Sequence, residues 1–412
     1  MRAGFELCHA ARDRRVVVRM KIHRPMAEAA AGMIREVLRE KKVLDHVMRD
    51  TFAANPKWGK RDRAFIAETV FEVVRWRRAL EFVADQTSVP ALCAAQWVRM
   101  GLAIPDWWPH DGAAPDEMRA RESALPDQPR ALRESIPDWL DEHCASELGG
   151  AWDGEIAALN RRAPVYLRVN TLRNDRDAAI AWLTDAGVEC EPVPGLADAL
   201  VLPAGKTLPK PLLAEGRVEV QDAGSQMIAP LLDARPGERV IDSCAGAGGK
   251  TLHLAALMNN EGRIHAMDAS ARKLQELTRR ARRARVKIVR STSLLEATPD
   301  DFAGLADRLL IDAPCSGLGT LRRQPDLKWR LTQAKLEKLR VLQRQILHDH
   351  AVMLKPGGRL VYATCSILPS ENSRVVESLA EAGGFSILAE HAVSPAATGF
   401  DGFQAFVMEK AR

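Results

Sequence analysis

The sequence lacks any apolar run of the roughly 18–20 residues that a membrane-spanning helix needs, so no membrane association is expected. Its N-terminal residues 1–19 hold only a short apolar stretch at 16–18, too little for the core of a secretory signal. Two acidic residues, Glu6 and Asp13, argue against an organelle transit peptide. We expect residues 1–19 to be an N-terminal extension that precedes an alternative start at Met20.

Closely spaced cysteine pairs are also missing. The seven cysteines stand at positions 8, 93, 144, 190, 244, 315 and 365, and no two of them have CxxC spacing. This excludes the usual structural zinc sites, and no metal is expected. An odd, dispersed set of cysteines is typical of a reducing cytoplasm rather than of a disulfide framework. We therefore expect a cytoplasmic protein, and a monomer.

Two common glycine-rich phosphate motifs are absent, although a glycine-rich loop is present after the strand 239–242. A Walker loop would need glycine at 244, where the chain has Cys244, and a dinucleotide fingerprint would need its third glycine at Thr251. What remains is a glycine-rich turn at a helix start and an acid, Asp268, at the end of the next strand. A carboxylate placed there can accept both hydroxyl protons of a ribose. The pattern favours S-adenosylmethionine as the cofactor.

Charge of one sign is not in large excess, since 59 Lys and Arg stand against 54 Asp and Glu. The distribution is uneven, because residues 272–344 hold 18 basic and 8 acidic residues. Such a cluster is an electrostatic footprint for a polyanion. Charge alone leaves a second interpretation open, the solvated surface of arginine-rich helices.

At 412 residues the chain is long enough for two or three domains. From about residue 217, apolar strands alternate with helices, which predicts a doubly wound, mostly parallel α/β sheet. Two final strands without a helix between them predict an antiparallel hairpin at the sheet edge. The expected strands are 239–242, 263–267, 286–290, 308–311, 359–364, 385–389 and 403–408, and the expected helices are 250–258, 270–284, 332–354 and 370–382.

The first half of the chain has a different pattern. Helical spacing of apolar residues over 20–90 predicts a small bundle, and five prolines make 101–135 a loop-rich boundary. A strand–helix–strand order follows, which suits a small α+β unit of the kind that often binds RNA, although a structural spacer has the same composition. The predicted division is 1–19 extension, 20–125 helical domain, 126–216 small α+β subdomain and 217–412 catalytic domain.

Two cysteines and an acid stand at predicted strand ends. Asp312 and Cys315 follow the strand 308–311, and Cys365 follows the strand 359–364. A thiolate that adds to carbon 6 of a pyrimidine makes carbon 5 nucleophilic, and a nearby carboxyl can share a proton with the ring. The residues alone do not decide which of the two thiols attacks. Cys244 is expected to pack or to contact a ligand through its backbone.

The motifs that carry these residues resemble the RNA cytosine-C5 methyltransferases of the RsmB/Sun type. The resemblance covers about 217–412, and 20–200 is similar in outline to the family's N-terminal RNA-binding parts, with a NusB-like bundle. The motifs are 220–226, 242–251, 312–319, the basic segment 322–329 and 364–366.

The resemblance implies a class I, Rossmann-like methyltransferase fold and a role for each site residue. Cys365 would be the nucleophile, Cys315 would help to resolve the covalent adduct, and Asp312 would line both the cofactor pocket and the base pocket. The implied S-adenosylmethionine site consists of Cys244, Ala245, Gly246, Ala247, Gly248, Gly249, Lys250, Asp268 and Asp312. Two departures stand out: Gly246-Ala247 replaces the family's Ala-Pro, and no acid stands near Thr292, where the adenine would lie.

The resulting hypothesis is an S-adenosylmethionine-dependent enzyme that makes 5-methylcytosine in RNA, with small-subunit ribosomal RNA as the expected substrate. Three alternatives remain: transfer RNA as the substrate, a DNA cytosine methyltransferase, and a non-catalytic RNA-binding assembly factor. The assembly factor would need neither of the two thiols, Cys315 and Cys365.

Overall fold

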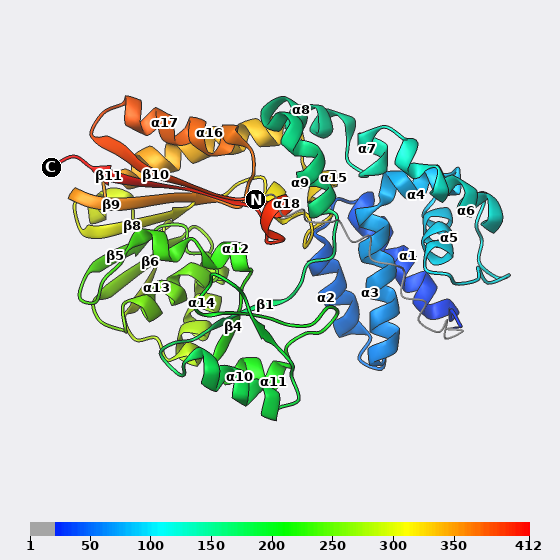
Figure 1. Ribbon diagram of the computed structural model, residues 1–412, viewed down its shortest axis with the longest axis horizontal. Coiled ribbons are helices and arrows are strands. Elements are labelled where there is room, and N and C mark those ends of the chain that lie inside the picture. The colour runs from blue at the N-terminus through cyan, green and yellow to red at the C-terminus, as the bar shows by residue number, and fades with distance from the viewer. Residues whose placement is uncertain (1–20) are drawn as a thin grey trace, which may run out of the picture. The chain divides into compact units, whose positions relative to one another are not determined.

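The computed structural model describes residues 21–412, so the predicted extension 1–19 lies outside the described residues. The chain divides into two compact units, the first ending at Ile136 and the second comprising Pro137–Arg412 (Figure 1). The domain limits predicted at 125/126 and 216/217 stay predictions. The second of them falls inside the larger unit.

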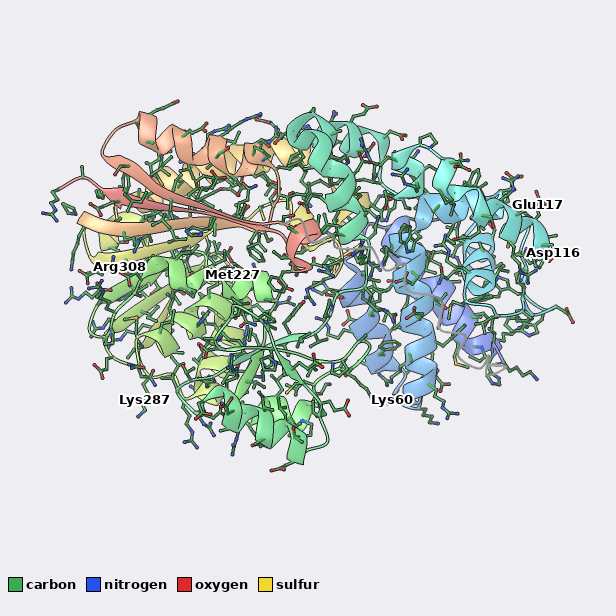
Figure 2. The ribbon with its side chains drawn as sticks, in the orientation of Figure 1. Lys60, Asp116, Glu117, Met227, Lys287 and Arg308 are labelled. Carbon is green, nitrogen blue, oxygen red and sulfur yellow. The ribbon has the colours of Figure 1, made fainter. Side chains whose placement is uncertain are left out.

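The first unit is helical, as the spacing of its apolar residues predicts. Buried side chains such as Ile34 on α1 and Ile66 on α3 form its interior, whereas Lys60 at the start of α3 is exposed (Figure 2). Its helices are α1 Arg24–Leu38, α2 Leu44–Ala54, α3 Lys60–Arg75, α4 Arg77–Ala84, α5 Val89–Arg99, α6 Pro115–Ser123 and α7 Arg130–Arg133.

Two helices of this unit, α6 and the single turn α7, lie where a loop-rich boundary was expected. The stretch 101–135 is predicted to be loop-rich, yet it contains α6, which begins at Pro115. Proline is tolerated in the first turn of a helix because the N–H that it lacks would have no helical partner there. The acidic residues Asp116 and Glu117 follow in the same turn. Their negative charges interact favourably with the positive end of the helix dipole.

The second unit begins with two helices and a small antiparallel sheet. The helices are α8 Asp138–Leu148 and α9 Trp152–Leu159, and the sheet has the strand order β2-β3-β1-β4. Its strands are β1 Tyr166–Val169, β2 Glu191–Pro192, β3 Ala199–Val201 and β4 Val218–Val220, and it is accompanied by α10 Arg176–Asp185 and α11 Lys210–Ala214. The central strand β1 pairs antiparallel with both β3 and β4.

The rest of the second unit is built on a seven-stranded sheet with the order β10-β11-β9-β8-β5-β6-β7. The strands are β5 Arg239–Asp242, β6 Arg263–Asp268, β7 Val289–Ser293, β8 Ala306–Asp312, β9 Leu354–Thr364, β10 Phe385–Val393 and β11 Phe403–Lys410. Strands β5 to β9 pair in parallel, whereas β11 is antiparallel to both β9 and β10. The predicted parallel sheet and its antiparallel edge hairpin are therefore confirmed. The expectation that no helix lies between the last two strands is wrong, because the single helical turn α18 Pro395–Thr398 connects them.

Helices cover both faces of this sheet (Figure 1). The longer helices are α13 Gly249–Leu257, α14 Ala271–Ala284, α16 Gln333–Ala351 and α17 Ser373–Glu381. Leu347 of α16 and Val376 of α17 pack in the core on one face, and Leu254 of α13 packs in the core on the other. Two apolar layers, one on each face, explain why consecutive residues of an inner strand, such as Leu309 and Leu310 of β8, are both buried.

The predicted strand 286–290 lies three residues too early, because the observed strand β7 is Val289–Ser293. Arg285 ends α14 in the left-handed conformation, with φ 60°. Val286 then donates its N–H to Ala281 O and packs against Ala284. Val286 therefore completes the helix end, as apolar residues after a left-handed cap commonly do, and the strand starts after it.

Candidate active site

Four adjacent parallel strands end on the same edge of the large sheet and carry the predicted site residues. Asp242, Asp268 and Asp312 are the last residues of β5, β6 and β8, and Cys365 follows β9 directly. In open α/β sheets, ligands bind at the carboxyl ends of the strands. The structure thus brings together residues that lie up to 123 positions apart in the printed sequence.

The glycine-rich loop after β5 is shaped by its neighbours. Gly248 has φ +87°, and a Cβ atom there would lie 2.7 Å from Cγ of Leu277, so only glycine fits without displacement. Gly246 donates its N–H to Asp268 Oδ2 at 2.9 Å, and Ser270 donates its N–H to Oδ1 at 2.7 Å. The carboxylate of Asp268 is therefore fixed in orientation, and each of its oxygens can accept a further hydrogen bond.

Two cavities flank this loop, with volumes of about 540 and 300 Å³. Both are lined by Cys244, Lys273 and Asp312, so they adjoin one another. The larger also contains Asp268 and the apolar side chains of Leu294, Pro314, Leu342 and Ile346. The smaller cavity is polar and is lined by Ala245, Gly246, Ala247 and Gly249 of the loop. Its other lining residues include Gln221, Ser225, Asp242, Lys250 and Arg280.

These cavities suit a ligand with one flat apolar end and one charged end. The larger cavity combines apolar walls with the acid that a ribose requires. In the smaller cavity, the buried Oδ1 of Asp242 has no hydrogen-bond partner within the described part of the chain, although buried polar atoms are normally paired. An ammonium group would satisfy it. The residues therefore fit S-adenosylmethionine, with the nucleoside beside Asp268 and the amino-acid end beside Asp242.

The acids in the smaller cavity are in different surroundings. Lys250 and Asp312 form an ion pair at 2.5 Å, and Lys250 Nζ lies 5.0 Å from the centre of the Phe403 ring. Asp242 is fully buried and accepts a hydrogen bond from Thr251 Oγ1 at 2.7 Å. Burial, with a smaller contribution from the nearby negative charge of Asp312, raises the pKa of Asp242 to about 7.

The two predicted thiols are in contact. Sγ of Cys315 lies 3.3 Å from Sγ of Cys365. The hydrogen bond with Cys365, together with burial, raises the pKa of the Cys315 thiol well above its usual value. Cys315 therefore keeps its proton and can donate it toward the sulfur of Cys365. Burial also raises the pKa of the Cys244 thiol, which agrees with the expectation that Cys244 is not a nucleophile.

The basic segment 322–329 does not form an exposed basic surface. Arg322 and Lys328 are buried, with 5% and 1% of their surfaces exposed. Arg323 bridges Asp222 and Asp401 through two ion pairs of 2.6 Å each. For this segment, both interpretations of the basic stretch, a polyanion-binding surface and a solvated one, are therefore wrong, because its cations contact distant parts of the second unit. Most exposed basic residues of the stretch lie on α14 and just after it: Arg272, Lys273, Arg279, Arg282, Arg285, Lys287 and Arg290. Lys335 and Lys338 of α16 are exposed as well. Figure 2 shows Lys287 at the surface.

The small sheet also contacts the cofactor loop. Arg168 of β1 is buried and donates to the carbonyl oxygen of Gly249 at 2.8 Å and to Gln221. Glu219 of β4 is buried and pairs with Arg280 and Arg283 of α14, at 3.0 and 2.6 Å. Arg280 in turn donates to the carbonyl oxygen of Ala247 at 2.8 Å.

Several residues at the site were not predicted from the sequence. Leu342, Ile346 and His350 line the larger cavity from α16. Burial lowers the pKa of His350, and its Nδ1 has no partner among the residues described. Their i, i+4, i+8 spacing puts them on one helix face. This spacing can be read from the sequence, but it does not predict that the face borders a cavity. Near Thr292, the larger cavity is bordered by Leu294 rather than by an acid.

Within residues 21–412 there is no cluster of three or more His, Cys, Asp or Glu side chains that could hold a metal ion. The same residues include no helix with the length and apolarity that a membrane crossing demands.

Two family models match this chain from residue 136 onward. A family model described as 16S rRNA methyltransferase RsmB/F matches residues 229–395, and a model of the ferredoxin-like domain of RsmF/B-like methyltransferases matches residues 136–207. A protein of Synechocystis named probable ribosomal RNA small subunit methyltransferase B is 38% identical over 246 residues, which cover 58% of this chain and 55% of that protein. Ribosomal RNA small subunit methyltransferase B of Serratia proteamaculans is 35% identical, with coverages of 58% and 56%. The chain thus spans a little over half the length of these curated relatives.

Solved structures share the fold. A crystal structure described as PH0851 has a TM-score of 0.77 and 23% identity, and it covers 95% of this chain and 100% of its own. A methyltransferase homologue from Pyrococcus horikoshii has a TM-score of 0.61 and 26% identity, with coverages of 70% and 99%. These likenesses confirm the predicted Rossmann-like methyltransferase fold, and the family models confirm the predicted family, whose cofactor is S-adenosylmethionine. Over residues 136–207 and 229–395, this chain matches the RsmB/F methyltransferase family.

Proposed function

We propose that this protein methylates carbon 5 of a cytosine in RNA, that the RNA is small-subunit ribosomal RNA, and that Cys365 forms a covalent adduct with the base. The observation that carries the proposal is the 3.3 Å contact between Cys315 and Cys365. Cys315 directly follows Pro314, which lines the larger of the two cavities together with Asp312. The names of the curated relatives support ribosomal RNA as the substrate. The cytoplasm is the proposed site of action, and a monomer the proposed state.

The chain's own residues account for the steps at the base. The sulfur of Cys365, as a thiolate, forms a bond to carbon 6, and the electron pair of the 5,6 double bond becomes available at carbon 5. Asp312 and its partner Lys250 stabilise charge at the ring nitrogen. The base must be turned out of its stack to reach these residues. Bound S-adenosylmethionine supplies an electrophilic methyl group.

The second thiol, that of Cys315, helps to release the product from the covalent adduct. After carbon 5 has gained the methyl group, its proton leaves to a base, the 5,6 double bond re-forms and the bond from carbon 6 to sulfur breaks. Cys365 then departs as a thiolate. A hydrogen bond from the neutral thiol of Cys315 stabilises that leaving group, which gives the two cysteines different tasks although they are in contact.

The test is methyl transfer by the full chain from tritiated S-adenosylmethionine to small-subunit ribosomal RNA, both naked and in subunits, with transfer RNA and duplex DNA as comparators. Bisulfite sequencing then locates the modified base. We expect Cys365→Ala to lose turnover by at least about 10³-fold. We expect Cys315→Ala to accumulate a protein–RNA adduct that survives denaturing electrophoresis. Cys190→Ala is the matched control, because Cys190 is a free cysteine that lines neither cavity, and it should retain turnover.

Each other outcome has a defined meaning. Full turnover by Cys365→Ala would refute the covalent step, and methylation of transfer RNA or DNA alone would refute the proposed substrate. Failure to bind S-adenosylmethionine would refute the enzyme assignment and leave an RNA-binding assembly factor.

A further inference from the structure

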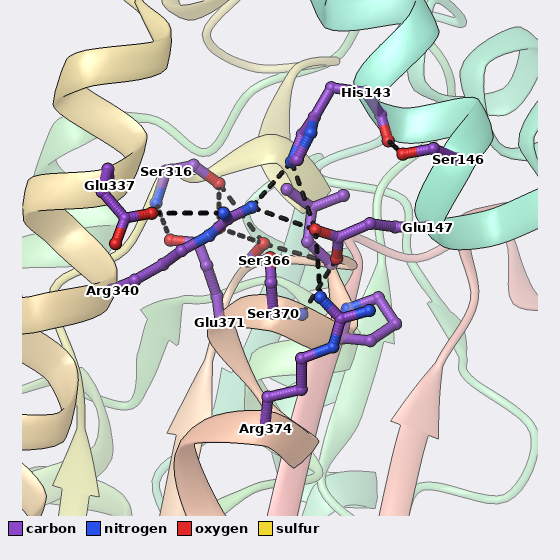
Figure 3. A network of polar contacts seen from close by, with 12 residues as sticks. His143, Ser146, Glu147, Ser316, Glu337, Arg340, Ser366, Ser370, Glu371 and Arg374 are labelled. Atoms are coloured by element: carbon purple, nitrogen blue, oxygen red, sulfur yellow. Dashed lines mark hydrogen bonds and ion pairs between the residues drawn. The ribbon is translucent and has the colours of Figure 1, made fainter.

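Glu371 is a carboxylate buried between the two cysteine loops, six residues after Cys365. It ends a short 3-10 turn, Pro369–Glu371, and none of its surface is exposed. Its Oε1 accepts hydrogen bonds from Ser316 N at 2.8 Å and from Gln343 Nε2 at 2.9 Å. Its Oε2 accepts from Ser316 Oγ at 2.5 Å and from Ser366 Oγ at 2.6 Å. Figure 3 shows the two serines directed toward this carboxylate.

Two of the three partners of Glu371 are the direct neighbours of the two thiols. Ser316 follows Cys315, and Ser366 follows Cys365. Gln343, the third partner, also donates to the carbonyl oxygen of Pro314 at 2.9 Å, so it holds the first loop on the other side of its cysteine. One side chain is therefore bonded to both cysteine loops.

Stability alone does not explain this arrangement. A buried charge loses its hydration, and apolar residues of the same size are often as stable. No residue within 21–412 forms a salt bridge with Glu371. The neighbouring Arg340 pairs with Glu147 at 2.9 Å and with Glu337 at 3.4 Å instead (Figure 3). The carboxylate is thus balanced only by neutral donors, and three of its four hydrogen bonds come from the residues next to the thiols.

We propose that Glu371 is a positioning residue that sets the distance between the thiols of Cys315 and Cys365 by binding the serine after each of them. Its catalytic consequence rests on the proposed function, because the hydrogen bond from Cys315 to the departing Cys365 requires the two sulfurs to stay in contact. The positioning itself does not depend on any substrate.

The first experiment measures the thiol distance without RNA. Diamide oxidises two neighbouring thiols: it takes up one hydrogen from each, is reduced to the hydrazine, and leaves a disulfide bond. In Glu371→Gln, an amide group replaces one acceptor oxygen and faces the donors of the serines or of Gln343. We expect the rate of Cys315–Cys365 cross-linking, followed by peptide mass spectrometry, to fall by about tenfold or more.

The second experiment is steady-state kinetics on the methylated RNA. A displacement of about 1 Å at reacting groups can cost about 10²-fold in rate, so Glu371→Gln should lower kcat by that order while KM for RNA and Kd for S-adenosylmethionine change less than about twofold. Glu377→Gln is the matched control, since Glu377 is exposed on the helix that follows, and it should behave like the wild type in both experiments.

A double variant protects the test against misfolding. Ser316→Ala with Ser366→Ala removes two of the four hydrogen bonds and leaves the carboxylate in place, so it should reproduce the slower cross-linking. Unchanged cross-linking in the folded Glu371→Gln protein, or in the double variant if the first does not fold, overturns the proposal. If the wild type methylates no RNA, the proposed function fails, and the cross-linking rates still decide the role of Glu371.

Discussion

Asp242 is a carboxylic acid in surroundings that disfavour its charge. Burial and the nearby Asp312 raise its pKa from 3.8 to about 7. A carboxyl group with a raised pKa binds more protons in the folded than in the unfolded protein between these two values. Its contribution to the free energy of unfolding is therefore lost as the pH rises from about 4 to about 7.

This predicts a pH-dependent effect of Asp242→Asn, which keeps an acceptor for Thr251 and cannot ionise. The variant should gain stability relative to the wild type between pH 5 and pH 8, by on the order of 1–3 kcal/mol. Urea unfolding of both proteins at the two pH values measures this difference. A stability difference that is the same at both pH values would contradict the raised pKa.

Among the elements, the glycine loop between β5 and α13 is tightly constrained. Gly248 has φ +87°, and a Cβ atom there would collide with the buried Leu277 of α14, whereas Gly383 has φ +86° and open space around it. An alanine in the left-handed region costs about 1–2 kcal/mol by itself. Crowding in a packed interior adds about 1–3 kcal/mol.

We therefore predict that Gly248→Ala lowers the free energy of unfolding by more than Gly383→Ala does, with the crowding cost as the difference. Gly248→Ala should also weaken the binding of S-adenosylmethionine, because the loop must shift away from Leu277. Chemical unfolding and calorimetric titration measure the two effects. Equal losses in the two variants would show that Leu277 gives way without cost.

At this scale the sequence predicts a great deal. The alternation of strands and helices identifies the large sheet, and the strand ends place Asp268, Asp312, Cys315 and Cys365 on one edge. What it does not predict depends on contacts between distant residues. Arg323 is ion-paired with Asp222, 101 positions earlier, and no local pattern distinguishes such an arginine from a solvated one. Glu371 is missed for the same reason, since one of its two serine partners lies 55 positions away.

For the whole molecule, the main electrostatic feature is the exposed basic side of α14 and the residues just after it. Phosphate contacts make RNA affinity depend on salt, with a slope of about −0.7 to −0.9 per neutralised phosphate on logarithmic axes. Replacing Arg282 and Lys287 by Glu should weaken RNA binding and make that slope shallower by up to about two such contacts. Binding titrations over a range of salt concentrations measure both quantities.

The control for this prediction carries the same change of charge elsewhere. Arg239 and Arg263 are exposed at the first residues of β5 and β6, the end of these strands opposite to the site. Their replacement by Glu should leave the salt slope unchanged. Equal effects of the two double variants would mean that net charge, rather than this basic side of α14, governs the affinity.

The contacts of Arg168 and Glu219 have a consequence for how the protein can vary. A buried cation of the small sheet holds a carbonyl of the cofactor loop, and a buried anion of the same sheet holds two arginines of α14. Removing the two arginines would leave the charge of Glu219 buried without its counterpart, a loss of about 3–5 kcal/mol. The two sheets therefore have to vary together. A recombinant that joins the small sheet of one relative to the catalytic sheet of another should fold only when the residues that pair across the two sheets come from the same relative.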